Sequence, residues 1–253
     1  MKPIGYQLYT SRNFSPMSDT LRLISEVGYT FVEGYPRLFE TEQSKDALQR
    51  GLLENELTMP SSYFSLSMLQ NDPKDTIETC KRFGIQYVVL PNLIPALRPS
   101  TNEGWRSFGY LISDMAKPIQ DAGINFVYHN SKFEFVRLPN GDFPFDLILE
   151  ADSSVLIELD PAWIVMANND PLEWLLRYAE RVHLVHVKDI ATPGTNINED
   201  GWADIGYGIM NWKSLWAALD AVNVKYRILE HENLADHWRF CRRSMAAIRD
   251  FER

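Results

Sequence analysis

Arg181-Val-His-Leu-Val-His-Val-Lys-Asp189 is the stretch of this 253-residue sequence that decides the fold. Its apolar run is short and ends in charged and metal-capable side chains. Apolar runs of this length, bounded by helical patterns, are typical of parallel strands that are buried on both faces. The stretch therefore predicts a buried strand over residues 182–188, with His186 close to its carboxyl end.

Three further segments in the second half of the chain repeat this pattern. They are Phe126-Val-Tyr-His-Asn130, Val155-Leu-Ile-Glu-Leu-Asp160 and Tyr226-Arg-Ile-Leu-Glu-His231. In a βα barrel the carboxyl ends of the strands together form the catalytic rim. We therefore expect Asp160, His186 and Glu230 to point into one shared mouth.

The whole chain reads as eight repeats of a strand followed by a helix. The strands are predicted over residues 4–9, 30–34, 58–66, 86–90, 125–130, 156–160, 182–188 and 226–230. The length suits one (β/α)8 TIM barrel spanning residues 1–253, with a small rim hairpin at 132–145 around Pro139-Asn-Gly-Asp142. The alternative, an open doubly wound sheet, lacks its GxGxxG signature, because Tyr9-Thr-Ser-Arg-Asn-Phe14 follows the first strand.

Charge and cysteine content limit the classes of partner. The net charge of −9 opposes binding to a phosphate backbone, so nucleic acid is not an expected partner. Cys80 and Cys241 form no CxxC pattern, which fits a reducing compartment without a disulfide framework. No segment approaches the ~20 apolar residues of a membrane span, and no charged segment with a long apolar stretch opens the chain. We expect a cytoplasmic protein that has no membrane partner and that can form a homo-oligomer.

The polar residues at the strand ends can also have purely structural roles. Asp160 lies on the same strand face as Glu158, yet a carboxylate there can simply cap the next helix. His183 and His186 are three residues apart and face opposite sides of a strand, so only His186 can enter the mouth. Polar residues after Glu230 can form a solvated loop, and this reading is stronger for His231 and Glu232 than for Glu230.

Two residues at the end of the fifth strand are candidates for its metal ligand. His129 ends the strand, whereas Glu134 follows it within Phe133-Glu-Phe135 and could fold back over the rim. We favour Glu134 as a metal ligand and His129 as a substrate contact. The alternative for Glu134 is a hairpin residue that faces water.

Several segments together resemble the sugar phosphate isomerase/epimerase family of xylose-isomerase-like barrels. They are Ile4-Gly-Tyr-Gln-Leu-Tyr9, Tyr128-His-Asn-Ser-Lys-Phe-Glu-Phe135, Glu158-Leu-Asp-Pro-Ala-Trp163, His186-Val-Lys-Asp189 and Ile205-Gly-Tyr-Gly-Ile-Met-Asn-Trp212. The resemblance implies one divalent metal ion held by Glu134, Asp160, His186 and Glu230. The sequence departs from the family pattern at Ser131, where a second histidine is usual, and at Ser62-Tyr63, where a histidine is common.

These donors suit Mn²⁺, which we expect, or Mg²⁺, Co²⁺ or Zn²⁺. The implied function is a metal-dependent sugar isomerase or epimerase that abstracts a proton next to a metal-bound carbonyl, with Glu134 and Glu230 as acid and base. Alternatives are a lyase or dehydratase acting on a keto-sugar, a nuclease of the same barrel type, which the five histidines and the acidity disfavour, and a non-catalytic sugar-binding subunit. The residues expected to contact the sugar are Gln7, Tyr9, Glu33, Tyr63, Asn92, His129, Trp163 and Lys188.

Overall fold

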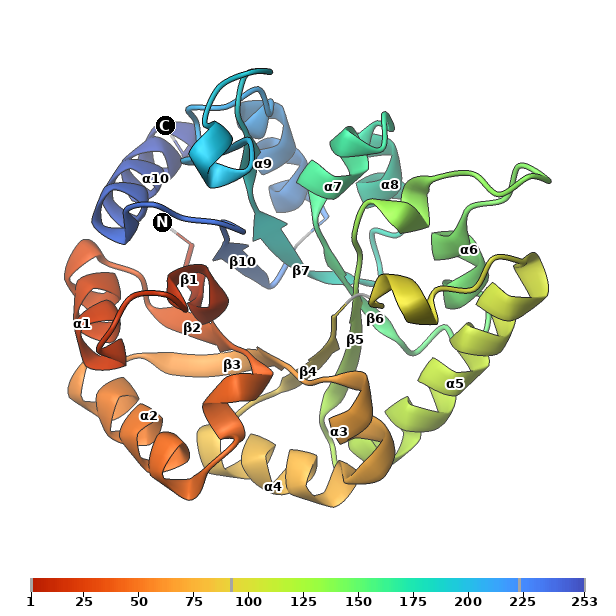
Figure 1. Cartoon of the computed structure of the whole chain (residues 1–253), viewed down its shortest axis with the longest axis horizontal. Coiled ribbons are helices and arrows are strands. Elements are labelled where there is room, and N and C mark those ends of the chain that lie inside the picture. The colour runs from red at the N-terminus through yellow and green to blue at the C-terminus, as the bar shows by residue number, and fades with distance from the viewer. Residues whose placement is uncertain (1, 92, 223, 253) are drawn as a thin grey trace.

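Eight parallel strands close into a barrel in the computed structural model, which describes residues 2–91, 93–222 and 224–252. The strands follow the order β1-β10-β7-β6-β5-β4-β3-β2 around the barrel (Figure 1). The predicted TIM barrel is therefore confirmed, and the chain forms a single domain. The barrel strands are β1 (Ile4–Gln7), β2 (Phe31–Gly34), β3 (Thr58–Tyr63), β4 (Tyr87–Leu90), β5 (Asn125–His129), β6 (Leu156–Leu159), β7 (Val182–Val187) and β10 (Tyr226–Leu229).

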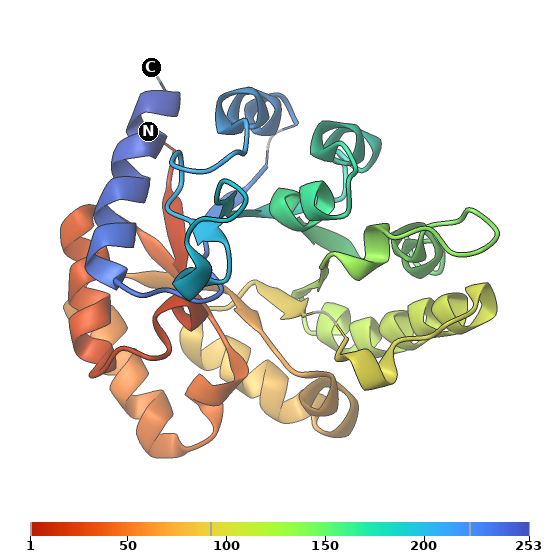
Figure 2. The same ribbon diagram turned by 45° about the horizontal axis from the view of Figure 1, so that its top comes forward.

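Helices surround the barrel as an outer layer (Figures 1 and 2). They are α1 (Met17–Val27), α2 (Glu42–Glu54), α3 (Leu66–Asn71), α4 (Pro73–Phe83), α5 (Asn102–Asp121), α6 (Pro144–Leu149), α7 (Pro161–Met166), α8 (Pro171–Arg177), α9 (Trp212–Ala221) and α10 (His237–Phe251). Short 3-10 turns are η1 (Leu8–Ser11), η2 (Pro36–Phe39), η3 (Pro95–Leu97), η4 (Phe133–Phe135) and η5 (Ile197–Glu199). None of the described helices combines the length and the apolar character that a bilayer span requires.

Local signals in the sequence explain where the helices begin and end. Gly28 and Gly84 stop α1 and α4 in the left-handed conformation, at φ of 104° and 71°. The side chains of Thr41 and Thr101 accept hydrogen bonds from the first turns of α2 and α5. These caps fix where the helices begin and end.

The barrel wall separates two apolar cores. Side chains on the outer strand faces, such as Tyr128 of β5, pack in the large core between the sheet and the helices. A smaller core fills the lower part of the barrel interior. It consists of Phe31, Tyr87, Val89, Val127, Leu184 and Ile228. Because side chains alternate along a strand, the next inward positions toward the carboxyl ends lie directly above this plug.

The segment 132–145 differs from the predicted hairpin. The tight turn is present, since Gly141 N donates to Leu138 O at 2.8 Å and Leu138 N donates to Asp142 O at 2.8 Å. The arms, however, are η4, an irregular loop and the start of α6 rather than paired strands. The loop projects outward from the barrel (Figure 1), and its tip is tied to α5 by Asn102 Nδ2, which donates to Asp142 Oδ2.

Another feature was not predicted: a two-stranded antiparallel pair, β8 (Asp189–Ile190) with β9 (Trp202–Ala203), within the long loop after β7. Asp189 anchors this loop. Its carboxylate accepts hydrogen bonds from the backbone N–H groups of Ile190, Gly206, Gly208 and Met210. The loop is thereby folded back over the end of β7.

The packing of α5 on α6 generates a prediction. A Cβ at Gly109 would lie 2.5 Å from the carbonyl oxygen of Ile148, which is backbone and cannot easily move. We expect Gly109→Ala to lower the free energy of unfolding by about 1–3 kcal/mol, despite the higher helix propensity of alanine. Urea unfolding measures this difference. The matched control Ser107→Ala, at an exposed position of the same helix, should change it by less than about 0.5 kcal/mol, and equal effects would contradict the packing argument.

Candidate active site

A layer of polar side chains lies directly above the apolar plug, at the carboxyl ends of the strands. Its members come from neighbouring strands and are almost completely buried. They are Gln7, Glu33, His129, Glu158, Asp160, His186, Lys188 and Glu230. Since all of them follow the inward parity of their strands, the alternation of the barrel wall alone brings them together.

His186 lies at the centre of this layer. Its Nδ1 is 2.8 Å from Glu230 Oε2, and its Nε2 is 2.7 Å from Glu33 Oε2. Glu158 Oε2 lies 3.4 Å from the same Nε2. Burial opposes the charged imidazolium, but the attraction of Glu158 and Glu230 outweighs it and raises the pKa of His186 well above its ordinary value.

Lys188 is the second buried cation. Its Nζ lies 2.8 Å from Asp160 Oδ2, 2.6 Å from Glu230 Oε2 and 2.7 Å from Glu232 Oε1. Burial alone would lower the pKa of Lys188, but these carboxylates raise it well above its ordinary value. The ammonium group also lies 5.0 Å from the ring centre of Trp163 and 5.1 Å from that of Trp202.

Asp160 has both of the roles considered for it: it caps a helix, and it belongs to the polar layer. Its Oδ1 caps α7 by accepting from the N–H groups of Ala162 and Trp163, while its Oδ2 faces Lys188. The side chain of Asn130 holds the Asp160 backbone through two hydrogen bonds, of 2.9 Å and 3.2 Å. The carboxylate is thus oriented from both sides, and Asn130 is a positioning residue that the sequence interpretation did not assign.

Buried negative charge exceeds buried positive charge in this layer. Both carboxylate oxygens of Glu158 and one of Glu33 make no hydrogen bond. Glu158 Oε2 lies 3.1 Å from His129 Nδ1, but the two atoms are not aligned as a hydrogen bond. Burial and then the charge of Glu33 raise the pKa of Glu158 well above its ordinary value. Such an arrangement favours a further cation.

A cavity of about 290 Å³ opens above these groups. It is lined by Tyr9, Tyr35, Pro36, Tyr63, Pro91, His129, Glu230 and Glu232. Glu232, expected to face solvent in a loop, instead reaches Lys188 and lines this mouth. Strand alternation does not predict this position, because Glu232 lies beyond the end of β10.

Three of the predicted sugar contacts, Tyr9, Tyr63 and His129, line the cavity. Tyr63 stacks on His186 with ring centres 5.8 Å apart, and Trp163 flanks Lys188. Gln7 lies deeper, where its Nε2 donates to Glu33 Oε2 at 2.7 Å, so it supports the polar layer. Asn92 lies outside the described residues.

Glu134 is not brought to this layer. Its carboxylate accepts from the Tyr128 hydroxyl at 2.7 Å and from the Ser131 N–H at 2.9 Å. Tyr128 lies on the helix-facing side of β5, whereas His129, the next residue, faces the barrel interior. The alternation of β5 therefore makes His129 the inward donor of this strand and holds Glu134 behind the wall. Burial raises the pKa of Glu134 to about 7.

His183 points away from the mouth, as its spacing predicts. It lies near the start of β7, at the opposite end of the barrel. There its Nδ1 lies 3.4 Å from the Tyr87 hydroxyl oxygen.

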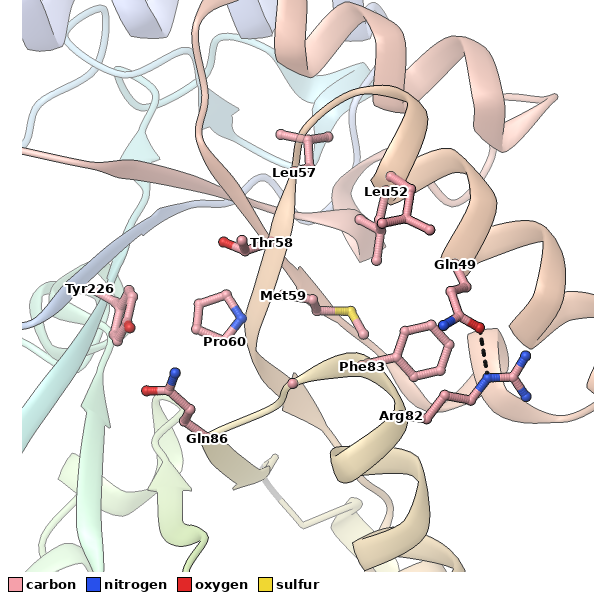
Figure 3. A pocket seen from close by; sticks show the side chains of 12 residues that line it. Gln49, Leu52, Leu57, Thr58, Met59, Pro60, Arg82, Phe83, Gln86 and Tyr226 are labelled. Carbon is pink, nitrogen blue, oxygen red and sulfur yellow. Dashed lines mark hydrogen bonds between the residues drawn. The ribbon is translucent and has the colours of Figure 1, made fainter.

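A separate hollow of about 310 Å³ lies at that opposite end, between α2, α4 and the start of β3 (Figure 3). Its lining is mainly apolar, including Leu52, Met59 and Phe83. The guanidinium of Arg82, in its wall, donates a hydrogen bond to Gln49 and forms ion pairs with Glu42 and Asp46. Without a converging set of free polar groups, this hollow does not compete with the mouth as a catalytic site.

The polar layer fits a divalent metal ion by its donor chemistry. Asp160, His186 and Glu230 offer one ligand atom each within 4.8 Å of one another, and His129, Glu158 and His186 form a second such group. Both groups are buried and combine carboxylate oxygens with imidazole nitrogen, a donor set suited to Mn²⁺, Co²⁺ or Zn²⁺. Among the described residues, the oxygens of Glu158 and Glu33 that make no hydrogen bond are further donors for such an ion.

Comparison with known proteins assigns this barrel to a class. The chain belongs to the xylose isomerase-like TIM barrel family, whose model matches residues 21–249. A comparison with curated proteins gives no match.

Three solved structures share the fold. A sugar phosphate isomerase/epimerase from Parabacteroides distasonis ATCC 8503 is 21% identical, with a TM-score of 0.81 over 98% of each chain. The 3-keto-D-glucoside 4-epimerase YcjR from E. coli, in its apo form, is 18% identical, with a TM-score of 0.74 over 99% of this chain and 100% of that one. The IolI protein with a bound zinc atom is 14% identical, with a TM-score of 0.76 over 100% and 96%. At these identities the likeness establishes the fold alone.

The buried Glu134 generates a pH prediction. Its pKa is raised from 4.5 to about 7, so it stays protonated in the folded protein while the unfolded chain ionises. Its contribution to stability is therefore constant below pH 4.5, falls as the pH rises to 7, and is constant above that. Over this window the free energy of unfolding of Glu134→Gln should gain about 3 kcal/mol relative to the parent.

Urea unfolding of parent and variant at several pH values measures this difference. Glu180→Gln, which alters an exposed carboxylate, is the matched control and should run parallel to the parent. Parallel curves for Glu134→Gln as well would contradict the raised pKa.

Proposed function

We propose that this protein is a divalent-metal-dependent sugar isomerase or epimerase. The observation that carries the proposal is the buried layer of Asp160, His186 and Glu230, with Lys188 beside them, under a polar cavity of about 290 Å³. A cavity of this size, with tyrosine rings and carboxylates in its wall, suits a small polyol. The sugar-processing neighbours of the same fold support this substrate class.

Asp160, His186 and Glu230 would hold the metal ion, and Glu158 of β6 is a further donor beside them. When bound, such an ion supplies Lewis-acid polarisation of a sugar carbonyl. Glu134 has no place in this set, because its carboxylate is engaged behind the wall of β5.

Glu230 is the base of the proposed mechanism. It lines the cavity, and although burial acts to raise its pKa, Lys188 and His186 outweigh burial and lower it well below the ordinary value. Glu230 is therefore ionised at neutral pH and able to accept a proton from the carbon beside the carbonyl. The electron pair of the broken C–H bond forms a double bond to the carbonyl carbon, and the π pair of the carbonyl moves onto its oxygen.

Lys188 would return a proton, since its ammonium group lies 2.6 Å from Glu230 Oε2 and can pass protons to and from it. Return to the neighbouring carbon, on the same face, gives an isomer. Return to the opposite face of the same carbon, which gives an epimer, would need a proton donor on the other side of the sugar, because Lys188 and Glu230 lie side by side. His129 enters from the far wall, separated from β10 by β6 and β7, and burial lowers its pKa well below the ordinary value. As a neutral imidazole it would orient the sugar hydroxyls.

Elimination is a second outcome of the same first step. The 3-DHS dehydratase AsbF from Bacillus anthracis, described as probable, shares the fold at 13% identity and a TM-score of 0.77 over 98% of this chain and 99% of that one. In this chain Lys188 would then protonate a departing hydroxyl group. Analysis of the products of a keto-sugar separates loss of water from a change of configuration.

Metal binding has a matched pair of variants. Asp160 and Asp170 each cap a short helix that starts with proline, but only Asp160 reaches the polar layer. We expect Asp160→Ala to abolish Mn²⁺ binding in calorimetry, because it removes a ligand and a negative charge. Asp170→Ala loses the same kind of cap and should bind Mn²⁺ like the parent. Parent-like Mn²⁺ affinity in Asp160→Ala would refute the assignment of this ligand.

Proton transfer is tested in D2O with ketoses and 3-keto sugars. Turnover should place solvent deuterium on a substrate carbon, and Glu230→Gln should slow this exchange at least about a hundredfold, because it removes the base. The exposed Glu180→Gln should not change the rate. Near-parent activity of Glu230→Gln would exclude the proposed base, and absence of exchange with every sugar would favour a non-catalytic barrel.

A further inference from the structure

A second hollow of about 370 Å³ adjoins the mouth and has no role in the mechanism above. Its lining contains two basic side chains and no acidic one. The lining residues are Arg98, Ser131, Lys132, Phe133, Val136 and Trp163. The chain as a whole is acidic, with 34 acidic and 25 basic residues, so a wall with basic side chains alone differs in charge from the rest. The mouth, in contrast, is lined by Glu230 and Glu232.

Arg98 is held in place in this hollow. Its guanidinium lies 3.7 Å from the ring centre of Phe133, which in turn stacks on Trp105 at 5.9 Å. Its Nε donates to Leu93 O at 2.8 Å. A guanidinium that is already oriented loses little freedom when it binds a ligand.

Arg98 and Lys132 place positive charge on this wall, and Arg98 acts on Glu134, where it opposes the rise in pKa that burial causes. Within residues 2–91, 93–222 and 224–252, no carboxylate forms an ion pair with Arg98 or Lys132, and neither Nη atom of Arg98 makes a hydrogen bond. The nearby Glu134 has both oxygens engaged by Tyr128 and Ser131. The outer nitrogens of Arg98 are therefore available as a fork of N–H donors.

Trp163 and the end of β5 lie between the hollow and the catalytic layer. Trp163 lines the hollow, and its ring centre lies 5.0 Å from Lys188 Nζ. His129 lines the mouth, and Ser131, two residues further along the chain, lines the hollow. A ligand that reached from the mouth to the hollow would pass over this boundary.

Ser131 is a small side chain in the wall of this hollow. A serine side chain is much smaller than an imidazole and leaves space beside Lys132 and Trp163.

We propose that the hollow of Arg98 and Lys132 is a subsite for an oxyanion, a phosphate ester or a carboxylate, at the end of the sugar remote from its carbonyl. The proposal deepens the proposed function and rests on it for the sugar. The acidic mouth would receive the carbonyl end, and the guanidinium fork matches the paired oxygens of either anion. The positive charge of the hollow and the negative charge of the mouth would thus fix which end of the sugar lies over the catalytic layer.

The first test uses inorganic phosphate and acetate on protein from which metal ions and then the chelator have been removed by dialysis, so that neither a metal ion nor a competing carboxylate can take part. Calorimetry at low salt should detect binding of at least one of them. Arg98→Met should weaken that binding at least about tenfold, and Lys132→Met by a smaller factor. The matched control is Arg137→Met, because Arg137 lies on the same segment but packs over Phe143, outside the hollow.

Ser131→His should also block the anion by filling the hollow, without changing the charge of Arg98. Thermal melting shows whether each variant is folded. If Arg98→Met unfolds, the exposed Lys132→Met and the filling variant Ser131→His decide the question. Undetectable binding of both anions, or binding that survives in these variants, would overturn the proposal.

The second test compares glucose, glucose 6-phosphate and glucuronate on protein supplied with Mn²⁺. At least one anionic sugar should bind about tenfold or more tightly than glucose, and its identity distinguishes phosphate from carboxylate. Equal affinities reject the subsite. Mn²⁺ affinity is measured separately: if Mn²⁺ binds and the anion does not, only the subsite fails, whereas anion binding without Mn²⁺ binding rejects the metal-dependent function alone.

Discussion

The burial of several carboxylates inside one barrel is the constraint on which the rest of the structure depends. Glu33, Glu158, Asp160 and Glu230 are all buried, and each would be costly to bury as an isolated charge. Lys188 and His186 offset part of that cost by lying between them. The remaining negative charge is a reason to expect a cation in the site, independent of any relative.

The surrounding elements hold these charges in position. The apolar plug below the layer keeps water from the lower barrel, so the carboxylates act on one another in a poorly screened environment. Above the layer, Asp189 folds the loop after β7 so that Trp202 lies over Lys188. Trp163 completes this enclosure from α7 and also borders the basic hollow, which makes its ring the boundary between an acidic and a basic compartment.

Much of the fold and part of the site could be predicted because they follow from local rules. Short apolar runs between amphipathic helices require a parallel sheet, and strand parity assigns Asp160, His186 and Glu230 to one face. The same rule applied to β5 would have chosen His129. Glu134 lies beyond the strand end, where parity no longer applies, and its direction depends on the Tyr128 hydroxyl and the Ser131 N–H.

The sequence by itself therefore determined the barrel, its single-domain extent and the strand ends that carry the donors, since periodicity and helix caps act between near neighbours. Only the tertiary structure decided how these donors pair. Lys188 meets Asp160 and Glu232, and Arg98 lies on Phe133, through contacts between segments that are 28 to 44 residues apart in the first case and 35 in the second. Such pairings depend on closure of the barrel and on loop paths, which no local pattern in the chain encodes.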